Sequence, residues 1–379
     1  MNLVYCIDSI RGIGGIQHVT ITKANALANL ENNSVWIIYA DHSGQLNYPL
    51  SPKVNIVDLG INYYEDDWKS RWKVLKGILI KRKKHRIALK KVLTEIRPDV
   101  VIAVGQSEKN LVATIRGPWA IVREFHFARN YRDLAAHALF ERLLALGGKF
   151  MDSFFLRKYD RIVILTQEDK ERHWPRWKNV SVIPNPVHLS LLHSSLRSNK
   201  ILSAGRLVYQ KNYSSLIRAF ALVTKRFPEW SLDIFGEGLE RESLHSLIKA
   251  LGLSKVVHLK GAGSKIQDIL QGYSIFALSS RFEGFPLVLV EALSCGLPIV
   301  SYSCPCGPKD IIRNGVDGFL VPPEDEVMMA ERICQLIEDE NLRREMGEAA
   351  LERAKEFSFE KVIPMWTTLF EELVKEKKK

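Results

Sequence analysis

Short apolar runs alternate with helix-length segments along almost the whole chain, and this alternation constrains the fold more than any other feature. In the first half the runs lie at residues 3–7, 34–40, 99–104, 119–125 and 160–165. Continuous Val and Ile runs of this length are typical of strands buried on both faces of a parallel sheet. Strands that alternate with helices form right-handed βαβ units, so this half predicts a doubly wound α/β domain.

The alternation stops near two prolines and then starts again. Pro184 and Pro186 interrupt the pattern, and the polar segment 193–200 follows them as a linker. Five further apolar runs come in the second half, at 200–205, 230–236, 256–261, 273–280 and 298–303.

Two domains in tandem follow from this repeat and from the length of 379 residues, which is long for one core. We expect Rossmann-like domains at residues 1–187 and 188–357, with a C-terminal helix at 358–376 packed back on the first domain. Two doubly wound sheets that face each other leave a central cleft at the carboxyl ends of their strands, where such folds bind ligands.

The composition favours a globular protein of the cytoplasm. The chain is 46% hydrophobic and 26% charged, which is ordinary for a soluble protein. No uninterrupted apolar stretch approaches the roughly 20 residues that cross a bilayer. Asp8 and Arg11 follow the N-terminal run closely, so no signal peptide is expected.

Metal-ligand patterns are weak in this sequence. Cys304 and Cys306 form the one close cysteine pair among five cysteines, and no second pair or histidine pattern of a zinc site accompanies them. The acidic run 65–67 lies on a charged stretch rather than at a strand end. We expect reduced thiols and no bound metal.

A glycine-rich loop, with Gly12, Gly14 and Gly15, follows the first apolar run and precedes a helix. Such a loop cradles a pyrophosphate in dinucleotide-binding folds. Here the dinucleotide fingerprint fails, because Gln17 occupies the place of its last glycine and Asp41 comes too late to bind a ribose. The loop alone therefore leaves two alternatives, a tight packing turn or a cradle for another phosphate.

Residues 69–91 carry eleven Lys and Arg and no acid, in a chain whose net charge is +11. Basic residues interleaved with apolar ones at helical spacing are typical of a segment in an anionic membrane interface. A solvated charged helix is the alternative, and no nucleic-acid reading motif supports a third. The apolar spacing breaks at 81–86, so we expect two helices or a helix and a loop. The interleaved apolar residues are Trp68, Trp72, Leu75, Ile78 and Leu79.

The most informative segment spans residues 279–302. A loop after the run 273–280 carries Glu283 and Gly284, and Pro286 stands where proline favours the first turn of a helix. Backbone N–H groups at such a helix start form an anion site. Glu291 follows eight residues after Glu283 within the expected helix, and a carboxylate there can accept hydrogen bonds from sugar hydroxyls.

This segment resembles the Glu-x7-Glu motif of the family-4 retaining glycosyltransferases of the GT-B fold, and the resemblance covers nearly the whole chain. "AGRLVYQKN" at 204–212 is similar to their "GR-L---KN" element, and "FGEGLERESL" at 235–244 is similar to their "G-G" turn. "CGPKDIIRNGVDGFLVPP" at 306–323 and "VIPNPV" at 182–187 are similar to the segments after the donor pocket and at the domain junction.

The resemblance implies a role for each matching residue. Arg206 and Lys211 would neutralise the donor diphosphate, tasks that suit a planar guanidinium and a mobile ammonium. Glu291 would bind the nucleotide ribose. Glu283 would hold the transferred sugar and its phosphate together with the backbone of four residues, Gly284, Phe285, Pro286 and Leu287.

Two first-domain positions complete the implied site. His126, expected at the end of the strand in "VREFHF", would lie near the reacting carbon of the donor sugar. Gly14 and Gly15 would close over the donor phosphate and sugar from the opposite domain, which would make their loop a cradle for the pyrophosphate of a nucleotide sugar.

The implied activity is retaining transfer of a hexose or N-acetylhexosamine from a nucleotide-diphosphate sugar, expected to be UDP-linked, to a lipid-linked or polysaccharide glycan. No metal or cofactor is expected, and peripheral association with the cytoplasmic membrane would follow from the basic segment. Asp310 and Pro186 replace residues that are usually Glu and Gly in the family, which leaves the donor sugar open.

Two other functions remain as alternatives. A nucleotide-sugar epimerase or a phosphorylase would share the fold, but neither first-domain carboxylates for proton chemistry nor a pyridoxal lysine is evident. A non-catalytic binder of anionic membranes would use the basic segment, but it would leave Arg206, Lys211, Glu283 and Glu291 without a purpose.

Overall fold

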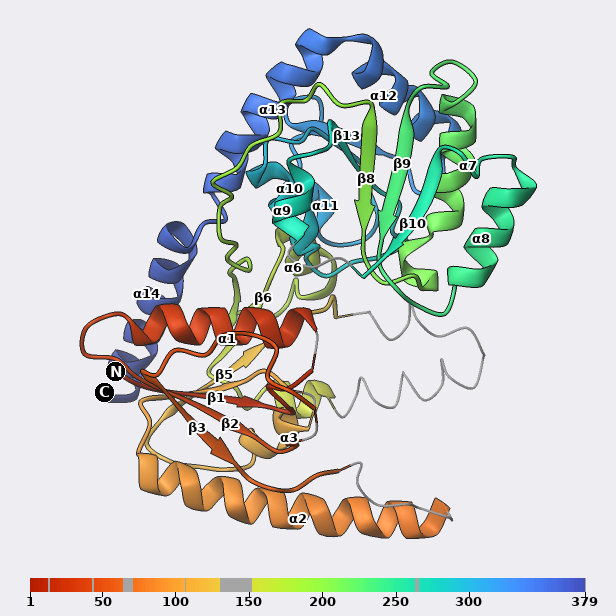
Figure 1. Cartoon of the computed structure of the whole chain (residues 1–379). Coiled ribbons are helices and arrows are strands. Elements are labelled where there is room, and N and C mark those ends of the chain that lie inside the picture. Colours follow the sequence, from red (N-terminus) through yellow and green to blue (C-terminus); the bar gives the residue numbers. More distant parts are fainter. Residues whose placement is uncertain are drawn as a thin grey trace.

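The computed structural model contains two parallel β-sheets, one formed by each half of the chain (Figure 1). The structure describes residues 1–12, 14–42, 44–63, 71–105, 107–129, 152–262 and 266–378, and for residues 71–76 it describes the backbone alone. The acidic run at 65–67, Trp68, and the start of the basic segment lie outside the described residues, as do the side chains of Trp72 and Leu75.

The N-terminal sheet has seven parallel strands in the order β3-β2-β1-β4-β5-β6-β7. The direction of winding reverses between β1 and β4, so a crevice opens at their carboxyl ends. The strands are β1 (Asn2–Ile7), β2 (Ser34–Tyr39), β3 (Val54–Asp58), β4 (Val100–Ala103), β5 (Ala120–Glu124), β6 (Arg161–Ile164) and β7 (Val180–Val182).

The C-terminal sheet repeats this plan with six parallel strands in the order β10-β9-β8-β11-β12-β13. The reversal here lies between β8 and β11. The strands are β8 (Lys200–Ala204), β9 (Ser231–Phe235), β10 (Val257–Gly261), β11 (Ile275–Leu278), β12 (Ile299–Tyr302) and β13 (Gly318–Val321). The expected α/β class with two doubly wound sheets is therefore confirmed.

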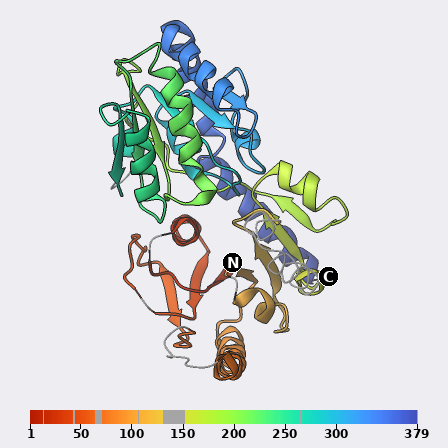
Figure 2. The same cartoon turned by 90° about the vertical axis from the view of Figure 1, so that its right-hand side faces the viewer.

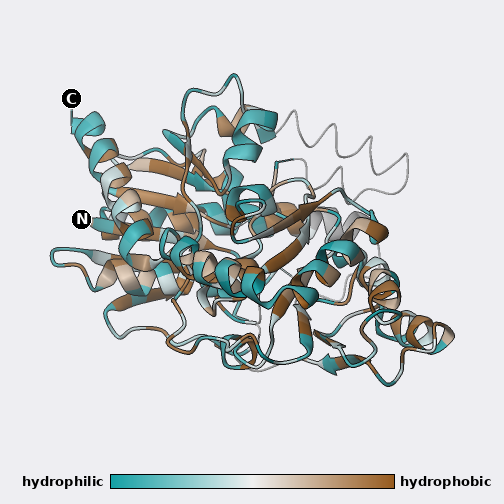
Figure 3. Cartoon of the chain, turned by 90° about the horizontal axis from the view of Figure 1, so that it is seen from above, coloured by the Kyte–Doolittle hydropathy of each residue, from teal (hydrophilic) through white to brown (hydrophobic). Residues whose placement is uncertain are grey.

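Helices cover both faces of each sheet, and each sheet has apolar cores on its two sides. Figure 3 shows the consequence, with hydrophobic strands inside and helices that mix hydrophilic and hydrophobic residues outside. The helices of the described N-terminal part are α1 (Gly15–Ala28), α2 (Arg71–Ile96), α3 (Glu108–Val112) and α6 (Gln167–His173). Those that follow are α7 (Tyr213–Val223), α8 (Arg241–Ala250), α9 (Ile266–Leu270), α10 (Leu287–Ser294), α11 (Pro308–Ile311), α12 (Glu326–Glu338), α13 (Glu340–Lys355) and α14 (Phe359–Lys378), besides the 3₁₀ turn η1 (Tyr209–Lys211).

Helix α14 leaves the C-terminal domain and packs on the N-terminal sheet. Its apolar side chains, Trp366 and Phe370 among them, are buried in the same core as residues of β1 and α1. Figure 2 shows this helix descending beside the N-terminal strands. The chain crosses between the domains at two neighbouring places, because Val187 donates its N–H to the carbonyl of Phe357 at 2.9 Å.

Helix α2 corrects one expectation from the sequence. It is a single 26-residue helix from Arg71 to Ile96, with no break at residues 81–86. Lys and Arg are good helix formers, and His85 turns inward and is buried with Leu89 and Leu93. The charged run is therefore part of one helix. The buried side of this helix continues through the run because His85 takes the place of an apolar residue there.

Candidate active site

A cleft of about 490 Å³ separates the two domains at the carboxyl ends of their sheets. Its walls come from the segments that follow β1, β2, β5 and β7 in one domain and β8 and β11 in the other. The lining residues that the sequence singled out are Gly14, Gly15, His126, Arg206, Lys211, Glu283, Gly284, Phe285 and Leu287. Pro286 and Glu291, by contrast, are not among the lining residues.

The first wall is the start of helix α1. Gly14 is the N-cap residue, with extended backbone, and Gly15 is the first residue of the helix. A Cβ added to Gly15 would lie 4.0 Å from the Leu287 side chain of the other domain, so the two domains nearly touch here. The helix start directs N–H groups toward the cleft and offers the partial positive charge that favours an anion.

The opposite wall carries Arg206 and Lys211 on the loop after β8. The Arg206 side chain is exposed and forms no ion pair with any residue in the part of the chain that the structure describes. The glycine turn after β9 supports this loop by close backbone packing. A Cβ on Gly236 would lie 1.9 Å from the carbonyl oxygen of Gly205, and one on Gly238 would lie 2.3 Å from that of Leu207.

Glu283 is buried at the edge of the cleft and is held by a network of donors. Its Oε1 accepts hydrogen bonds from Lys211 Nζ and from Ser280 Oγ, each at 2.6 Å. Its Oε2 lies 3.4 Å from Gln210 Nε2. Lys211 and Glu283 therefore form an ion pair at the edge of the cleft.

The loop 283–286 is pressed between the two domains. A Cβ on Gly284 would lie 2.6 Å from the carbonyl oxygen of His126, and one on Gly307 would lie 2.5 Å from the ring of Pro286. Pro286 is the N-cap residue of α10, one position before the helix that it was expected to begin. The segment after β12 thus fixes this loop from behind, and His126 approaches it from the front.

Glu291 lies within α10 and is partly buried. Burial raises the pKa of its carboxyl to about 7. Among the described residues no side chain pairs with this carboxylate. Partial removal of an unpaired carboxylate from water is costly and often marks a functional site.

His126 follows β5 by two residues, because the strand ends at Glu124 rather than at the histidine. The pKa of His126 is lowered to about 4, chiefly by burial; the Glu124 carboxylate raises it, and Lys23 and Arg123 lower it. The imidazole is therefore neutral near pH 7. Its Nε2 lies 3.3 Å from Glu124 Oε1.

Several residues of the cleft were not singled out from the sequence. Gln17, Tyr48, Asn185 and Gln210 all line it. Asn185 is buried, and its side-chain oxygen has no hydrogen-bond partner among the described residues. Its place inside the "VIPNPV" element was the signal that could have found it, whereas Tyr48 lies in a loop without a recognisable motif.

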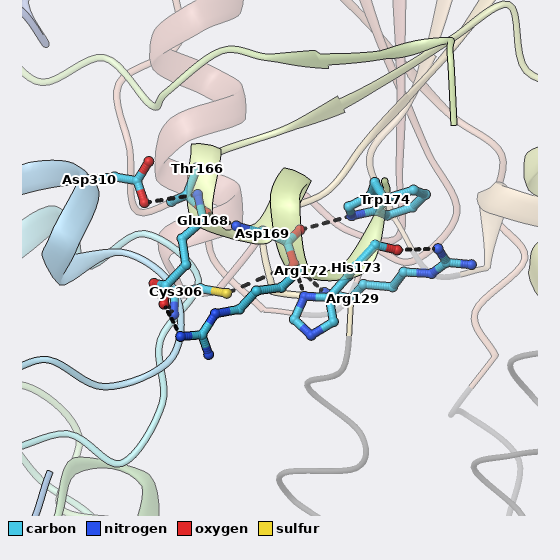
Figure 4. A network of polar contacts seen from close by, with 9 residues as sticks. All are labelled: Arg129, Thr166, Glu168, Asp169, Arg172, His173, Trp174, Cys306 and Asp310. Carbon is cyan, nitrogen blue, oxygen red and sulfur yellow. Dashed lines mark hydrogen bonds and ion pairs between the residues drawn. The ribbon is translucent and has the colours of Figure 1, made fainter. Parts of the chain in front are cut away.

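Outside the cleft, a polar network joins α6 of the N-terminal domain to the α11 region of the C-terminal domain (Figure 4). Asp310 accepts hydrogen bonds from the backbone N–H groups of Gln167 at 2.5 Å and Glu168 at 3.3 Å. In return, Glu168 accepts one from the backbone N–H of Cys306 at 2.9 Å. Each domain thus caps a helix region of the other.

The same network holds a group of three potential metal ligands, Asp169, His173 and Cys306, whose ligand atoms lie within 4.8 Å of one another. Asp169 already contacts His173 Nδ1 at 2.7 Å and accepts from Trp174 Nε1 at 3.0 Å. Burial raises the pKa of the Cys306 thiol to about 12. Cys306 Sγ lies 3.9 Å from Asp169 Oδ1, and this is the contact within the group that joins the two domains.

Two glycosyltransferases align with almost the full length of the chain. The amylovoran biosynthesis glycosyltransferase AmsD of Erwinia amylovora is 26% identical and covers 97% of this chain and 99% of its own. A Campylobacter jejuni enzyme is 27% identical over 98% of this chain and 99% of its own. It is named GalNAc-α-(1→4)-GalNAc-α-(1→3)-diNAcBac-PP-undecaprenol α-1,4-N-acetyl-D-galactosaminyltransferase.

A third relative matches only in part. An exopolysaccharide phosphotransferase of Streptomyces coelicolor is 33% identical over 298 residues, which are 76% of this chain. The chain spans 30% of that protein's length.

Solved structures share the fold at low sequence identity. Sucrose-phosphate synthase from Thermosynechococcus elongatus superposes with a TM-score of 0.81 at 17% identity, covering 98% of this chain and 99% of its own. Anabaena HepE in complex with UDP gives 0.77 at 18% identity, covering 98% and 100%. Residues 192–353 match the sequence model of the glycosyl transferases group 1. Residues 192–353 belong to the group 1 glycosyltransferase family, and the whole chain has the GT-B fold.

Proposed function

We propose that the protein transfers a hexose or N-acetylhexosamine from a UDP-sugar to a lipid-linked or polysaccharide glycan, with retention of the anomeric configuration. The observation that carries the proposal is the cleft, which brings Arg206 and the Lys211–Glu283 pair of one domain opposite the start of α1 and His126 of the other. The names of the relatives, which include a polysaccharide biosynthesis enzyme and one with an undecaprenol-linked acceptor, support this acceptor class.

Each part of the cleft has a task in this reaction. Arg206, Lys211 and the N-terminus of α1 stabilise the charge that develops on the leaving diphosphate. Glu291, which lies on α10 outside the lining residues of the cleft, accepts hydrogen bonds from the ribose, and Glu283 holds the sugar. The acceptor hydroxyl attacks from the face that the phosphate leaves, and a phosphate oxygen takes its proton.

The two cations of the cleft take the role that a divalent metal ion has in other transferases, so we propose a metal-independent enzyme. Transfer that persists at full rate in the presence of EDTA is the expected result. Loss of transfer on chelation and its recovery with added Mg²⁺ or Mn²⁺ would refute this part of the proposal.

The donor is tested with a panel of nucleotide sugars, by following which nucleotide diphosphate is released. UDP is the expected product, and calorimetry is expected to give tighter binding for UDP than for GDP. Arg206→Ala should reduce transfer about ten- to a hundredfold, the value of a lost charge-assisted hydrogen bond. Tighter binding of GDP would overturn the choice of donor.

Helix α2 is the surface proposed to bring the enzyme to an acceptor on the cytoplasmic face of a membrane. Its exposed apolar side chains, Leu79, Ile80 and Ile87, lie among exposed lysines and arginines. No helix that the structure describes is long and apolar enough to span a bilayer. Attraction to anionic lipids is about 1 kcal/mol for each Lys or Arg near the surface, which suffices for peripheral binding.

Sedimentation with vesicles tests this surface. Binding to anionic vesicles should exceed binding to neutral ones and should fall steeply with salt. The test variant replaces four exposed lysines of α2 by Gln: Lys83, Lys84, Lys90 and Lys91. The control replaces four exposed lysines elsewhere by Gln: Lys225, Lys249, Lys255 and Lys361. Equal loss in both variants, or equal binding to neutral and anionic lipid, would favour a soluble acceptor.

A further inference from the structure

The ammonium group of Lys23 is completely buried inside the N-terminal domain, behind the cleft. Lys23 lies in α1 and is 0% exposed. Its Nζ donates a hydrogen bond to Glu124 Oε1 and lies 4.2 Å from the centre of the Trp366 ring and 5.9 Å from that of Tyr5. A buried ion pair often contributes no more stability than apolar residues of the same volume would. Stability alone is therefore a weak reason for this pair.

The carboxylate of Glu124 lies between this ammonium and the imidazole of His126. Glu124 Oε1 contacts Lys23 Nζ on one side and lies 3.3 Å from His126 Nε2 on the other. All three side chains are buried, and His126 in addition lines the cleft. The group therefore connects α1, the end of β5 and the site of proposed sugar transfer.

The charges around His126 act in opposite directions. Burial lowers the pKa of His126 to about 4, Glu124 raises it, and Lys23 and Arg123 lower it. Burial alone would raise the pKa of Glu124, but chiefly the Lys23 ammonium brings it below its ordinary value. Tyr5, on β1, has its own pKa raised by burial and stays neutral. Three further ionisable side chains line the cleft from the other domain: Arg206, Lys211 and Glu283.

We propose that Lys23 is a positioning residue that neutralises Glu124, so that the carboxylate lies beside the His126 ring without drawing a proton onto it. This inference rests on the proposed function, in which His126 lies beside the reacting sugar. Positive charge develops on the sugar ring during glycosyl transfer, as it does in glycoside hydrolysis. A neutral imidazole there can accept a hydrogen bond from a sugar hydroxyl, whereas the positive charge of an imidazolium would repel the positive charge that develops on the sugar ring.

The variant Lys23→Met removes the ammonium and keeps the length of the side chain. Among the described residues, His126 is then the only neighbour in contact with Glu124 that can carry a positive charge, and the ring should take up a proton near or above pH 7. Histidine side-chain NMR measures this directly, with the His126 signals identified by their absence in His126→Asn. In the unmodified protein the ring should not titrate above about pH 5. Lys23→Gln serves as a second variant, because its amide keeps a hydrogen bond to Glu124.

The activity of the same variants gives an independent readout. With a ring pKa near 7, about one tenth of Lys23→Met carries a neutral His126 at pH 6, so kcat should fall about tenfold between pH 8 and pH 6. KM for the nucleotide sugar should change little. The double variant Lys23→Met/Glu124→Gln has no carboxylate to draw the proton, and its kcat should again be independent of pH over this range.

Two results would overturn the role of Lys23. One is a His126 ring that titrates below pH 5 in both Lys23→Met and Lys23→Gln. The other is a loss of kcat that is the same at pH 6 and pH 8 and is not relieved in the double variant, which would make Lys23 a packing residue. If no nucleotide sugar reacts with the unmodified protein, the proposed function fails, while the NMR titration still decides the role of Lys23.

Discussion

The carbonyl oxygen of His126 lies against the Cα of Gly284 across the cleft, so close that a Cβ on Gly284 would approach it to 2.6 Å. A side chain at residue 284 would have to displace either its own loop or the segment that carries His126. The contact therefore sets how near the two halves of the site come to each other.

Gly284→Ala should separate these two segments and reduce transfer tenfold or more, because a displacement of about 1 Å at a reacting site can cost a hundredfold. The melting temperature should change little, since the residue lies at the edge of the cleft. Steady-state kinetics and thermal unfolding check both expectations. Gly272→Ala is the control, because its Cβ would meet its nearest neighbour at 3.5 Å. Full activity in Gly284→Ala would show that the cleft has room to adjust.

The ion pair between Lys211 and Glu283 should open when the donor binds. Lys211→Met removes a cation from the diphosphate and should weaken UDP binding ten- to a hundredfold. Glu283→Gln releases Lys211 from its 2.6 Å partner and should leave UDP binding unchanged or tighter while transfer falls. Calorimetry with UDP separates the two effects. Equal weakening of UDP binding in both variants would mean that the pair acts as one unit.

Because the pKa of Glu291 is raised, the stability of the protein and its affinity for UDP should both depend on pH. Burial raises its pKa to about 7 from the ordinary value of an unfolded chain. The folded state therefore favours the protonated acid, and the stability that this acid contributes is lost as the pH rises toward and through 7. Glu291→Gln should gain about 1–3 kcal/mol over the unmodified protein at pH 8 and little at pH 5, measured by denaturant unfolding.

UDP should bind best where Glu291 is ionised, because a carboxylate accepts two ribose hydroxyls. Affinity should thus decline as the pH falls below about 7, beyond the change due to protonation of UDP itself. Glu291→Gln should bind UDP more weakly at pH 8 and lose this part of the decline. A decline of the same steepness in both proteins would remove Glu291 from the ribose site.

Asp310 and Glu168 each accept hydrogen bonds from backbone N–H groups of the other domain. These reciprocal contacts should hold the two domains at a fixed relative position. Asp310→Ala leaves two N–H groups of α6 without their cap, which costs about 1 kcal/mol. A larger radius of gyration without ligand and a higher KM for the donor are expected, by small-angle scattering and kinetics. Asp310→Glu keeps the carboxylate and should retain activity. An unchanged radius and KM in Asp310→Ala would show that the cap is dispensable.

Buried strands were the most predictable part of the fold. All four residues of β4, Val100 to Ala103, are buried, and such strands need a continuous apolar run. The edge strand β3 left no such run, because Asn55 and Ile56 are exposed. Helix α2 was divided in the prediction because the charged run 81–86 interrupts its apolar spacing, and the burial of His85 has no local signature.

The site was predictable where motif residues surround it. Arg206, Lys211, Glu283 and Gly284 lie on short loops after strands, and all four line the cleft. The Lys23–Glu124 pair could not be foreseen in this way. Its two members are 101 residues apart, and a lysine within a helix is ordinarily a surface residue.

The return of α14 to the N-terminal sheet bears on the order in which the protein can assemble during synthesis. Domains usually fold one after another as the ribosome makes them. Here the first sheet receives Trp366 and Phe370 into its core only after the entire second domain has been translated. Until then the ring that lies over Lys23 is missing, so the environment of His126 is completed late, by a segment that follows both sheets in the chain.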